Sequence, residues 1–370
     1  MQWRCYDVGA VIRTPLTMRA LSLGALLIAL VLAVPARPAA QGLPYALFER
    51  YLDALREEAG IPGLSAAIVQ NGRVVWDAGL GRQDLERSVA ARSDTPYLIG
   101  DLTQSVAAVV LGQCVERARL DIATPIQRWS SLPEPGATVG HVLSHTSTGT
   151  PGERFSYDAA RFGTLASVAQ DCAERPFRRA VAEDVFGALA MRDSLPGRDL
   201  NAMSALDSSY FNDGRLRDYE AVLGRLAVPY KVQRGGRATR SDYPADSVTA
   251  ATGLVSTVLD LARFDRALDD NQLLREDLKS IAWTNVTTSA GAPLPMGLGW
   301  FVQNHNGERL IWQLGAVRDA GSSLLLKVPG RGLTLILLAN GEGLAPPDAL
   351  SNGDVTGSLF VKLFLKLFLL

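Results

Sequence analysis

The sequence predicts an α+β fold, in which strands from both ends of the chain form one antiparallel sheet and a mostly helical region is inserted between them. In "GLSAAIVQNGRVVWDAGLG", two apolar runs flank Asn71-Gly72, a dipeptide that strongly favours a two-residue hairpin. Near the other end, "MGLGWFVQ" predicts a strand from Met296, and "SSLLLKVPGRGLTLILLANG" predicts two strands around a turn at Pro329 to Gly332. Strands therefore lie at both ends, and few lie between.

The domain organisation follows from this pattern. We expect one domain over residues 41–370, with its sheet part at about 43–100 and 294–370 and its helical part at about 101–293. The first helix is predicted at Leu43 to Ala59 from its apolar spacing. The natural place for a cleft is where the sheet meets the inserted helices.

Composition narrows the functional classes. The chain has 370 residues, of which 47% are hydrophobic and 20% charged, with a net charge of -1. Such a balance is typical of a globular protein with a large core and argues against a nucleic-acid binder, which would normally carry a basic face. No motif indicates an organic cofactor or a metal centre.

The N-terminal segment has the features of a signal peptide. Three arginines precede an apolar run, Ala20 to Val34, and small residues follow it. This run of about 15 residues is short for a membrane-spanning helix of roughly 20. We expect residues 1–40 to direct export to the periplasm or beyond, with translation starting at Met18. The alternative is an uncleaved membrane anchor.

Two cysteines remain once Cys5 is removed with the signal segment. Cys114 and Cys172 could pair in an exported protein. We favour two buried thiols, because Cys114 falls inside an apolar helical pattern.

The C-terminal tail, "LFVKLFLKLFLL", is apolar apart from Lys362 and Lys366, which lie one helical turn apart. A helix that covers the sheet is the favoured interpretation. Contact with a membrane surface is the alternative.

A series of sequence blocks resembles a known family. The blocks include "TPYLIGDLTQSVAAVVLGQCVERARLDIATPIQRW", "VGHVLSHTSTG", "PGERFSYDAARFGTL", "AATGLVSTVLDLARF" and "GSSLLLKVPGRGLTLILLAN", in that order. Together they resemble the serine β-lactamase and penicillin-binding-protein superfamily, in its class C-related branch. The resemblance runs from about Leu43 to Leu370 and implies the same two-part fold.

The family's catalytic motifs have lost their reactive residues. Members of the family that the chain resembles carry three motifs. These are S-x-x-K at a helix start, a Y-x-N segment, and a strand motif of Lys or His, a hydroxyl residue and Gly. The matching positions hold Asp101, Gln104, Tyr157, Ala159, Gln313 and Gly315. Only the tyrosine and the glycine are retained.

No substitute machinery is evident in the sequence. Another S-x-x-K does not occur, and "YFN" from Tyr210 matches Y-x-N by letters alone. His141 and His145 are four residues apart, but no third ligand accompanies them, so we interpret them as a structural pair. Asp101 could be a nucleophile or a general base. The simpler interpretation is a helix start, in which Asp101 and Gln104 form a capping-box-like pair.

These patterns favour an exported, catalytically inactive relative of the family. We expect it to bind a ligand or a protein partner at the cell envelope, through an old cleft whose lining we predict from the motif positions: Asp101, Gln104, Tyr157, Gln313 and Gly315. One alternative is a rewired hydrolase in which Asp101 and Tyr157 act on an ester, an amide or a sugar. A further alternative is a membrane-associated protein that works through its tail.

Overall fold

The computed structural model describes residues 39–233, 236–244 and 247–369. The predicted signal segment therefore lies almost wholly outside the described residues. The chain divides into two units, residues 1–46 and residues 47–370, and the second holds all the strands of the described part. Helix α2 (Ala39–Glu58) begins in the first unit and ends in the second.

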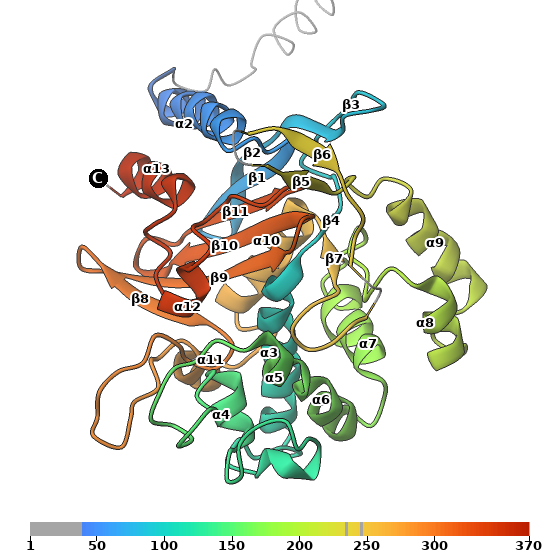
Figure 1. Ribbon diagram of the computed structural model, residues 1–370, viewed down its shortest axis with the longest axis vertical. Coiled ribbons are helices and arrows are strands. Elements are labelled where there is room, and N and C mark those ends of the chain that lie inside the picture. Colours follow the sequence, from blue (N-terminus) through green and yellow to red (C-terminus); the bar gives the residue numbers. More distant parts are fainter. Residues whose placement is uncertain (1–38, 234–235, 245–246, 370) are drawn as a thin grey trace, which may run out of the picture. The chain divides into compact units, whose positions relative to one another are not determined.

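The second unit contains a seven-stranded antiparallel sheet with the strand order β3-β2-β1-β11-β10-β9-β8 (Figure 1). The N-terminal hairpin pairs directly with the last strand, from Leu64 opposite Ala339 to Gln70 opposite Leu333. The predicted α+β fold, with its sheet built from both ends of the chain, is therefore confirmed. The strands are β1 Gly63–Gln70, β2 Arg73–Asp84, β3 Val89–Ala90, β8 Phe301–His305, β9 Glu308–Val317, β10 Gly321–Val328 and β11 Leu333–Ala339.

Local sequence explains the two hairpins. Asn71 and Gly72 both have positive φ (50° and 72°), as the tight β1–β2 turn requires. The turn after β10 is the short helix η4 (Pro329–Arg331), followed by Gly332 in the left-handed region. Strands β10 and β11 are buried along their whole length, which accounts for their continuous apolar sequence.

One predicted strand starts later than expected. The sequence predicts a strand from Met296, whereas β8 begins at Phe301. Gly299 has a φ of 77°, and the N–H of Gly297 donates to the carbonyl of Trp300, so residues 296–300 form a turn. A side chain at Gly299 would collide with Ala108 of the neighbouring helix, which explains the glycine at this close approach.

The inserted region is mostly helical. Its central helix α3 (Thr103–Glu116) is buried along nearly its whole length, and α10 (Val258–Asp269) packs against β1 and β11. The other helices are α4 Val139–Leu143, α5 Ala159–Gly163, α6 Leu165–Ala173, α7 Phe177–Ala180, η3 Val181–Gly187, α8 Leu200–Leu206, α9 Asp213–Leu223 and α11 Glu276–Ala282. Short strand pairs accompany them, namely β4 (Tyr97–Leu98) with β7 (Val255–Ser256) and β5 (Tyr230–Val232) with β6 (Ala238–Arg240).

The two cysteines form a disulfide bond, so the expectation of two free thiols was wrong. Cys114 on α3 and Cys172 on α6 have Cα atoms 6.0 Å apart. This separation arises because α3 and α6 pack side by side, a long-range contact that the helical pattern of α3 does not reveal.

The C-terminal tail forms helix α13 (Leu359–Phe368), preceded by α12 (Ala349–Asn352). Ser358 caps α13 by accepting a hydrogen bond from the N–H of Val361. The helix buries an apolar face that includes Phe364, whose ring contacts Phe48 of α2. Within the described residues, no helix combines the length and apolarity needed to cross a membrane.

Candidate functional site

The first site element is the start of the central helix. Gly100, with a φ of 54°, turns the chain from β4 into the short helix η1 (Gly100–Leu102), which leads into α3. Asp101 lies in η1 and Gln104 in the first turn of α3. Both are buried, with 8% and 0% of their surfaces exposed. These two motif positions therefore lie beside the sheet, and their side chains are buried beneath the surface.

The second element is β9, which carries Gln313 and Gly315. A Cβ atom on Gly315 would lie 2.1 Å from the carbonyl oxygen of Ile99, so only glycine allows the strand to approach η1 this closely. The next residue, Ala316, donates its N–H to Oδ2 of Asp101 at 3.2 Å. The glycine of the strand motif is thus retained for packing, independently of any chemistry.

Substitution of this glycine gives a test of the packing. Gly315→Ala is expected to lower the free energy of unfolding by about 1–3 kcal/mol, because η1 must shift away from β9. Urea denaturation measures this effect. The matched control is Gly224→Ala at the end of α9, where φ is -62° and the nearest heavy atom to an added Cβ is 3.5 Å away, an ordinary van der Waals contact. An equal loss in both variants would contradict the packing argument.

Gln104 is the centre of a hydrogen-bond network. Its amide nitrogen donates to the hydroxyl of Tyr157 at 2.8 Å, and its oxygen accepts from Nε2 of Gln313 at 3.2 Å. The two glutamines therefore bridge the place where the helix start faces the strand. The hydroxyl of Tyr157 also lies beside the carboxyl of Asp101 and lowers the pKa of that group. Four of the six predicted positions thus form one connected group.

His145 belongs to this group, and the sequence analysis missed its role. Its Nε2 lies 3.0 Å from the oxygen of Gln104, and its Nδ1 accepts from the N–H of Asp158 at 3.0 Å. Because Nδ1 accepts, a neutral ring carries its proton on Nε2 and donates it to Gln104. The sequence signal was its position in "LSHTSTG", just after α4, but the interpretation of His141 and His145 as a structural pair assigned it no place in the site.

Aromatic rings enclose one side of the network. The ring of His145 stacks on Tyr157, with centroids 4.4 Å apart, and on Phe162 at 5.2 Å. Tyr157 continues the column to Phe301, which stacks on Trp312 at 4.0 Å. These contacts fix the tyrosine and the histidine in orientation and keep the network away from water.

Burial shifts the pKa of each titratable group in the network. It raises the pKa of Asp101 to about 6, although hydrogen bonds from Ala316 and Tyr157 oppose the rise. Burial also lowers the pKa of His145 to about 3 and raises the pKa of Tyr157 well above its usual range. At neutral pH the tyrosine and the histidine are therefore uncharged, and Asp101 is a buried carboxylate.

One sequence interpretation needs correction. Asp101 and Gln104 do not form a capping box, because the N-cap of α3 is Leu102, without a side-chain cap, and both side chains turn to other elements. The interpretation of His141 and His145 as structural residues agrees with their hydrogen bonds, since Nδ1 of His141 accepts from the N–H of Thr138 and His145 binds Gln104 and the backbone of Asp158. The described residues contain no group of three or more metal-ligating side chains.

The remaining candidates lie outside the network. Ala159 is the first residue of α5 and provides no polar group at the asparagine position of the motif. Asn212, from the "YFN" segment, caps α9. The hydroxyls of Thr103 and Ser105 are buried without a hydrogen-bond partner, so no base is placed to activate either one.

The chemistry available to this site is limited. The lysine at 327, the most buried in the described chain, forms an ion pair with Asp265 of α10 and does not reach the network. The N–H of Ala316, which could otherwise stabilise a developing oxyanion, already donates to Asp101. The site therefore holds a carboxylate, a tyrosine and a neutral histidine that mainly satisfy one another.

The fold and the site together define a class. A seven-stranded antiparallel sheet with both chain ends, and a buried helix start facing an inner strand beside a tyrosine, form the architecture of penicillin-binding proteins and serine β-lactamases. The chain belongs to the beta-lactamase family, whose model matches residues 48–355.

Relatives are distant and mostly partial. Protein flp of Staphylococcus aureus (strain MW2) is 20% identical over 77% of this chain and 60% of its own length. The mitochondrial serine beta-lactamase-like protein LACTB of Mus musculus is 32% identical over 97 residues, 26% of this chain. The chain spans less than a fifth of the length of the mitochondrial relatives that it matches.

Solved structures share the fold. The octameric penicillin-binding protein homologue from Pyrococcus abyssi superposes with a TM-score of 0.69 at 21% identity, covering 84% of this chain and 78% of that one. The penicillin binding protein from Bacillus halodurans gives a TM-score of 0.64 at 18% identity, over 79% and 95% of the two chains.

Proposed function

We propose that this protein is a catalytically inactive member of the beta-lactamase family that is exported and binds a ligand or a partner at the cell envelope. The observation that carries the proposal is the closed network around Gln104. The positions of the family's nucleophile and its lysine hold Asp101 and Gln104, and both side chains are bound to their neighbours. In a comparable serine hydrolase, loss of the nucleophile or its base costs about 10⁴–10⁶ in turnover.

Electrostatics also oppose the family reaction. A β-lactam or a peptide terminus brings a carboxylate, which the buried charge of Asp101 would repel. The positions of the family's two basic groups hold the neutral side chains of Gln104 and Gln313. A ligand that binds here must replace the hydrogen bond between Gln313 and Gln104, which favours a neutral, amide-like ligand.

Export is supported by the disulfide bond. Cys114 and Cys172 are joined in the core, and such bonds persist in oxidising compartments. The predicted signal segment is an independent argument for the same location.

Intact-mass spectrometry tests the absence of an acyl-enzyme. The purified protein is incubated with a penicillin and, separately, with a serine-directed fluorophosphonate. We expect an unmodified mass with both, and a thermal-shift screen of neutral amides would then search for the ligand. An active family member treated in parallel establishes that the reagents work. A stable adduct would contradict the proposal, and Ser105→Ala would show whether that hydroxyl had reacted.

The alternative function is a rewired hydrolase, and one observation favours it. The pKa of Asp101, raised by burial to about 6, suits a general base near neutral pH, and Tyr157 lies in hydrogen-bond contact with it. Turnover of a p-nitrophenyl ester that disappears in Asp101→Asn would favour this alternative. Turnover that persists in the variant would indicate another source.

A further inference from the structure

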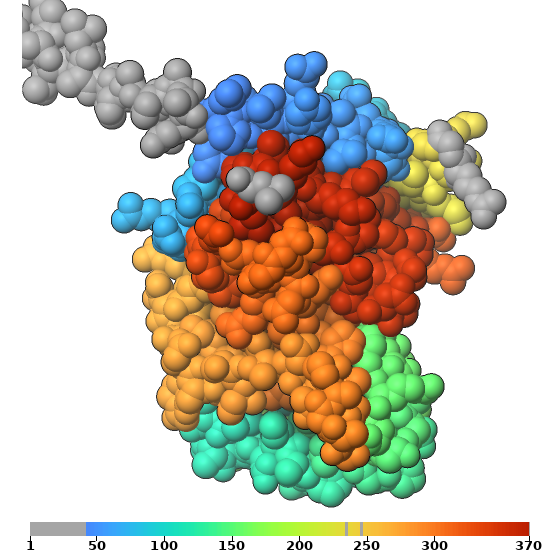
Figure 2. Space-filling view, turned by 90° about the vertical axis from the view of Figure 1, so that its left-hand side faces the viewer, coloured from blue at the N-terminus to red at the C-terminus, as the bar shows by residue number. Residues whose placement is uncertain are grey.

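A second site lies on the face of the sheet that α13 covers. A cavity of about 290 Å³ opens between α13, the β8–β9 hairpin and η4. This volume lies just below the usual range for ligand pockets, about 300–1,000 Å³. Figure 2 views the molecule from this side, with the C-terminal residues in red next to the orange residues around β8.

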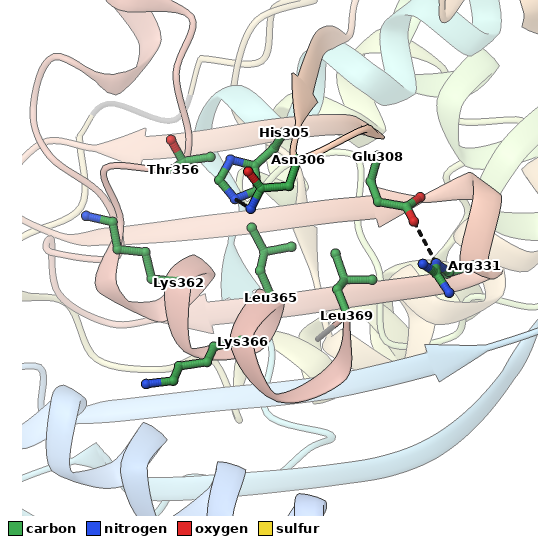
Figure 3. Close-up of a pocket in the computed structure, with 9 residues that line it drawn as sticks. All are labelled: His305, Asn306, Glu308, Arg331, Thr356, Lys362, Leu365, Lys366 and Leu369. Atoms are coloured by element: carbon green, nitrogen blue, oxygen red, sulfur yellow. Dashed lines mark hydrogen bonds and ion pairs between the residues drawn. The ribbon is translucent and has the colours of Figure 1, made fainter.

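The cavity is apolar in its centre and charged at its edges. Figure 3 shows Leu365 and Leu369 of α13 between two lysines on one side and the ion pair of Glu308 with Arg331 on the other. In this ion pair, Nε of Arg331 lies 2.7 Å from Oε1 of Glu308. A ligand here would therefore meet hydrocarbon in the middle and a polar rim around it.

Positive charge dominates this rim. Lys362 and Lys366 are exposed, and neither has an ion-pair partner among the residues that the structure describes. Among the described residues that line the cavity, Glu308 is the one carboxylate, and it is already paired with Arg331. The two lysines are also four residues apart on one helix, where like charges repel each other by about 0.2–0.5 kcal/mol. An anion bound between them would relieve this repulsion.

We propose that this cavity binds a single-chain lipid with an anionic head group. The acyl chain would lie against Leu365 and Leu369, and the head would be held by Lys362 and Lys366. Apolar burial of about 0.8 kcal/mol per CH₂ supplies most of the affinity, and the lysines select the charge. The site lies on a different face of the sheet from the Gln104 network and is independent of the function proposed for it.

Calorimetric titration of the full chain with dodecyl phosphate, below its micelle concentration, tests this site. We expect one-to-one binding that weakens at least tenfold in Lys362→Glu/Lys366→Glu. Arg73→Glu/Arg217→Glu, which changes the net charge equally at exposed residues of β2 and α9, is expected to retain wild-type affinity. Circular dichroism confirms that both variants are folded.

Three further ligands show whether binding of dodecyl phosphate depends on its head group, on its acyl chain or on a membrane surface. Inorganic phosphate and dodecanol are each expected to bind at least tenfold more weakly than dodecyl phosphate, since each lacks one half of the ligand. Phosphate binding as tight as that of dodecyl phosphate would overturn the lipid proposal in favour of a simple anion site. Binding to phosphatidylglycerol vesicles but not to monomeric dodecyl phosphate would overturn the proposed cavity site in favour of binding to a membrane surface. Equal binding by the lysine variant would overturn it as well.

Discussion

Loss of the disulfide bond between Cys114 and Cys172 is expected to lower the free energy of unfolding by about 4 kcal/mol. The two cysteines are 58 residues apart, and a cross-link over a loop of this length restricts the unfolded chain by about that amount in the chain-entropy model. The bond also joins α3, which carries the site, to α6. Its loss should therefore loosen the packing of the last turns of α3 against α6.

Urea denaturation with and without reductant measures this effect. Reductant should move the wild-type transition to the position of Cys114→Ala/Cys172→Ala and leave that variant unchanged. Titration of free thiols in the unfolded wild-type protein, before and after reductant, verifies that the treatment opens the Cys114–Cys172 bond. An identical wild-type transition with and without reductant would show that the bond adds nothing to stability. A large shift would mean that the protein reaches full stability only in an oxidising compartment.

The sheet was predictable because its signals are local. Asn71-Gly72 defines one hairpin, the turn at Pro329 to Gly332 defines another, and β10 and β11 are continuous apolar runs. The start of β8 was not predictable in this way. Residues 296–300 form a turn because Gly299 approaches α3, and that contact depends on a helix far away in the sequence.

The location of the site residues was predictable from the sequence, but their hydrogen-bond partners were not. Motif order placed Asp101, Gln104 and Gln313 at the junction of helix and strand, and the structure brings them there. Their partners depended on tertiary contacts. Sequence spacing alone predicts that Asp101 and Gln104 form a capping box. In the structure, Asp101 instead accepts from the N–H of Ala316 and Gln104 accepts from the side chain of Gln313, both on strand β9.

His145 shows the same limit. From the sequence alone, His145 and His141 are interpreted as a structural pair, because no third metal ligand accompanies them. In the structure its two nitrogens bind Gln104 and the backbone of Asp158, which lie 41 and 13 residues away. These contacts bury the ring, and burial lowers the pKa of His145 to about 3, a shift that its sequence position does not reveal.

The stability of the protein between pH 7 and pH 4 is expected to depend on two buried groups of opposite effect. The pKa of His145 is about 3 in the folded chain, against an ordinary value of 6.5 for a solvated histidine, so the unfolded chain takes up this proton first. Stability is therefore lost as the pH falls below 6.5, by about 3 kcal/mol at pH 4. Protonation also places an N–H on Nδ1 against the N–H of Asp158, which breaks the hydrogen bond there.

Asp101 acts in the other direction. Its pKa is about 6 in the folded chain, against an ordinary value of 3.8 for a solvated aspartate, so the folded chain takes up this proton first. Stability is gained as the pH falls through 6, by about 2 kcal/mol at pH 4. The two groups together leave the wild-type protein with a net loss of about 1 kcal/mol from this site.

Two variants separate these contributions. Between pH 7 and pH 4, Asp101→Asn should lose about 3 kcal/mol through His145, whereas His145→Gln should gain about 2 kcal/mol through Asp101. Glutamine can still donate to Gln104 and accept from Asp158, so the second variant keeps the network. Urea denaturation at both pH values measures the changes, and other groups titrate alike in all three proteins. If the free energy of unfolding changed with pH in the same way in both variants, the buried network would be contradicted. Such a result would mean that folding shifts the pKa of neither Asp101 nor His145.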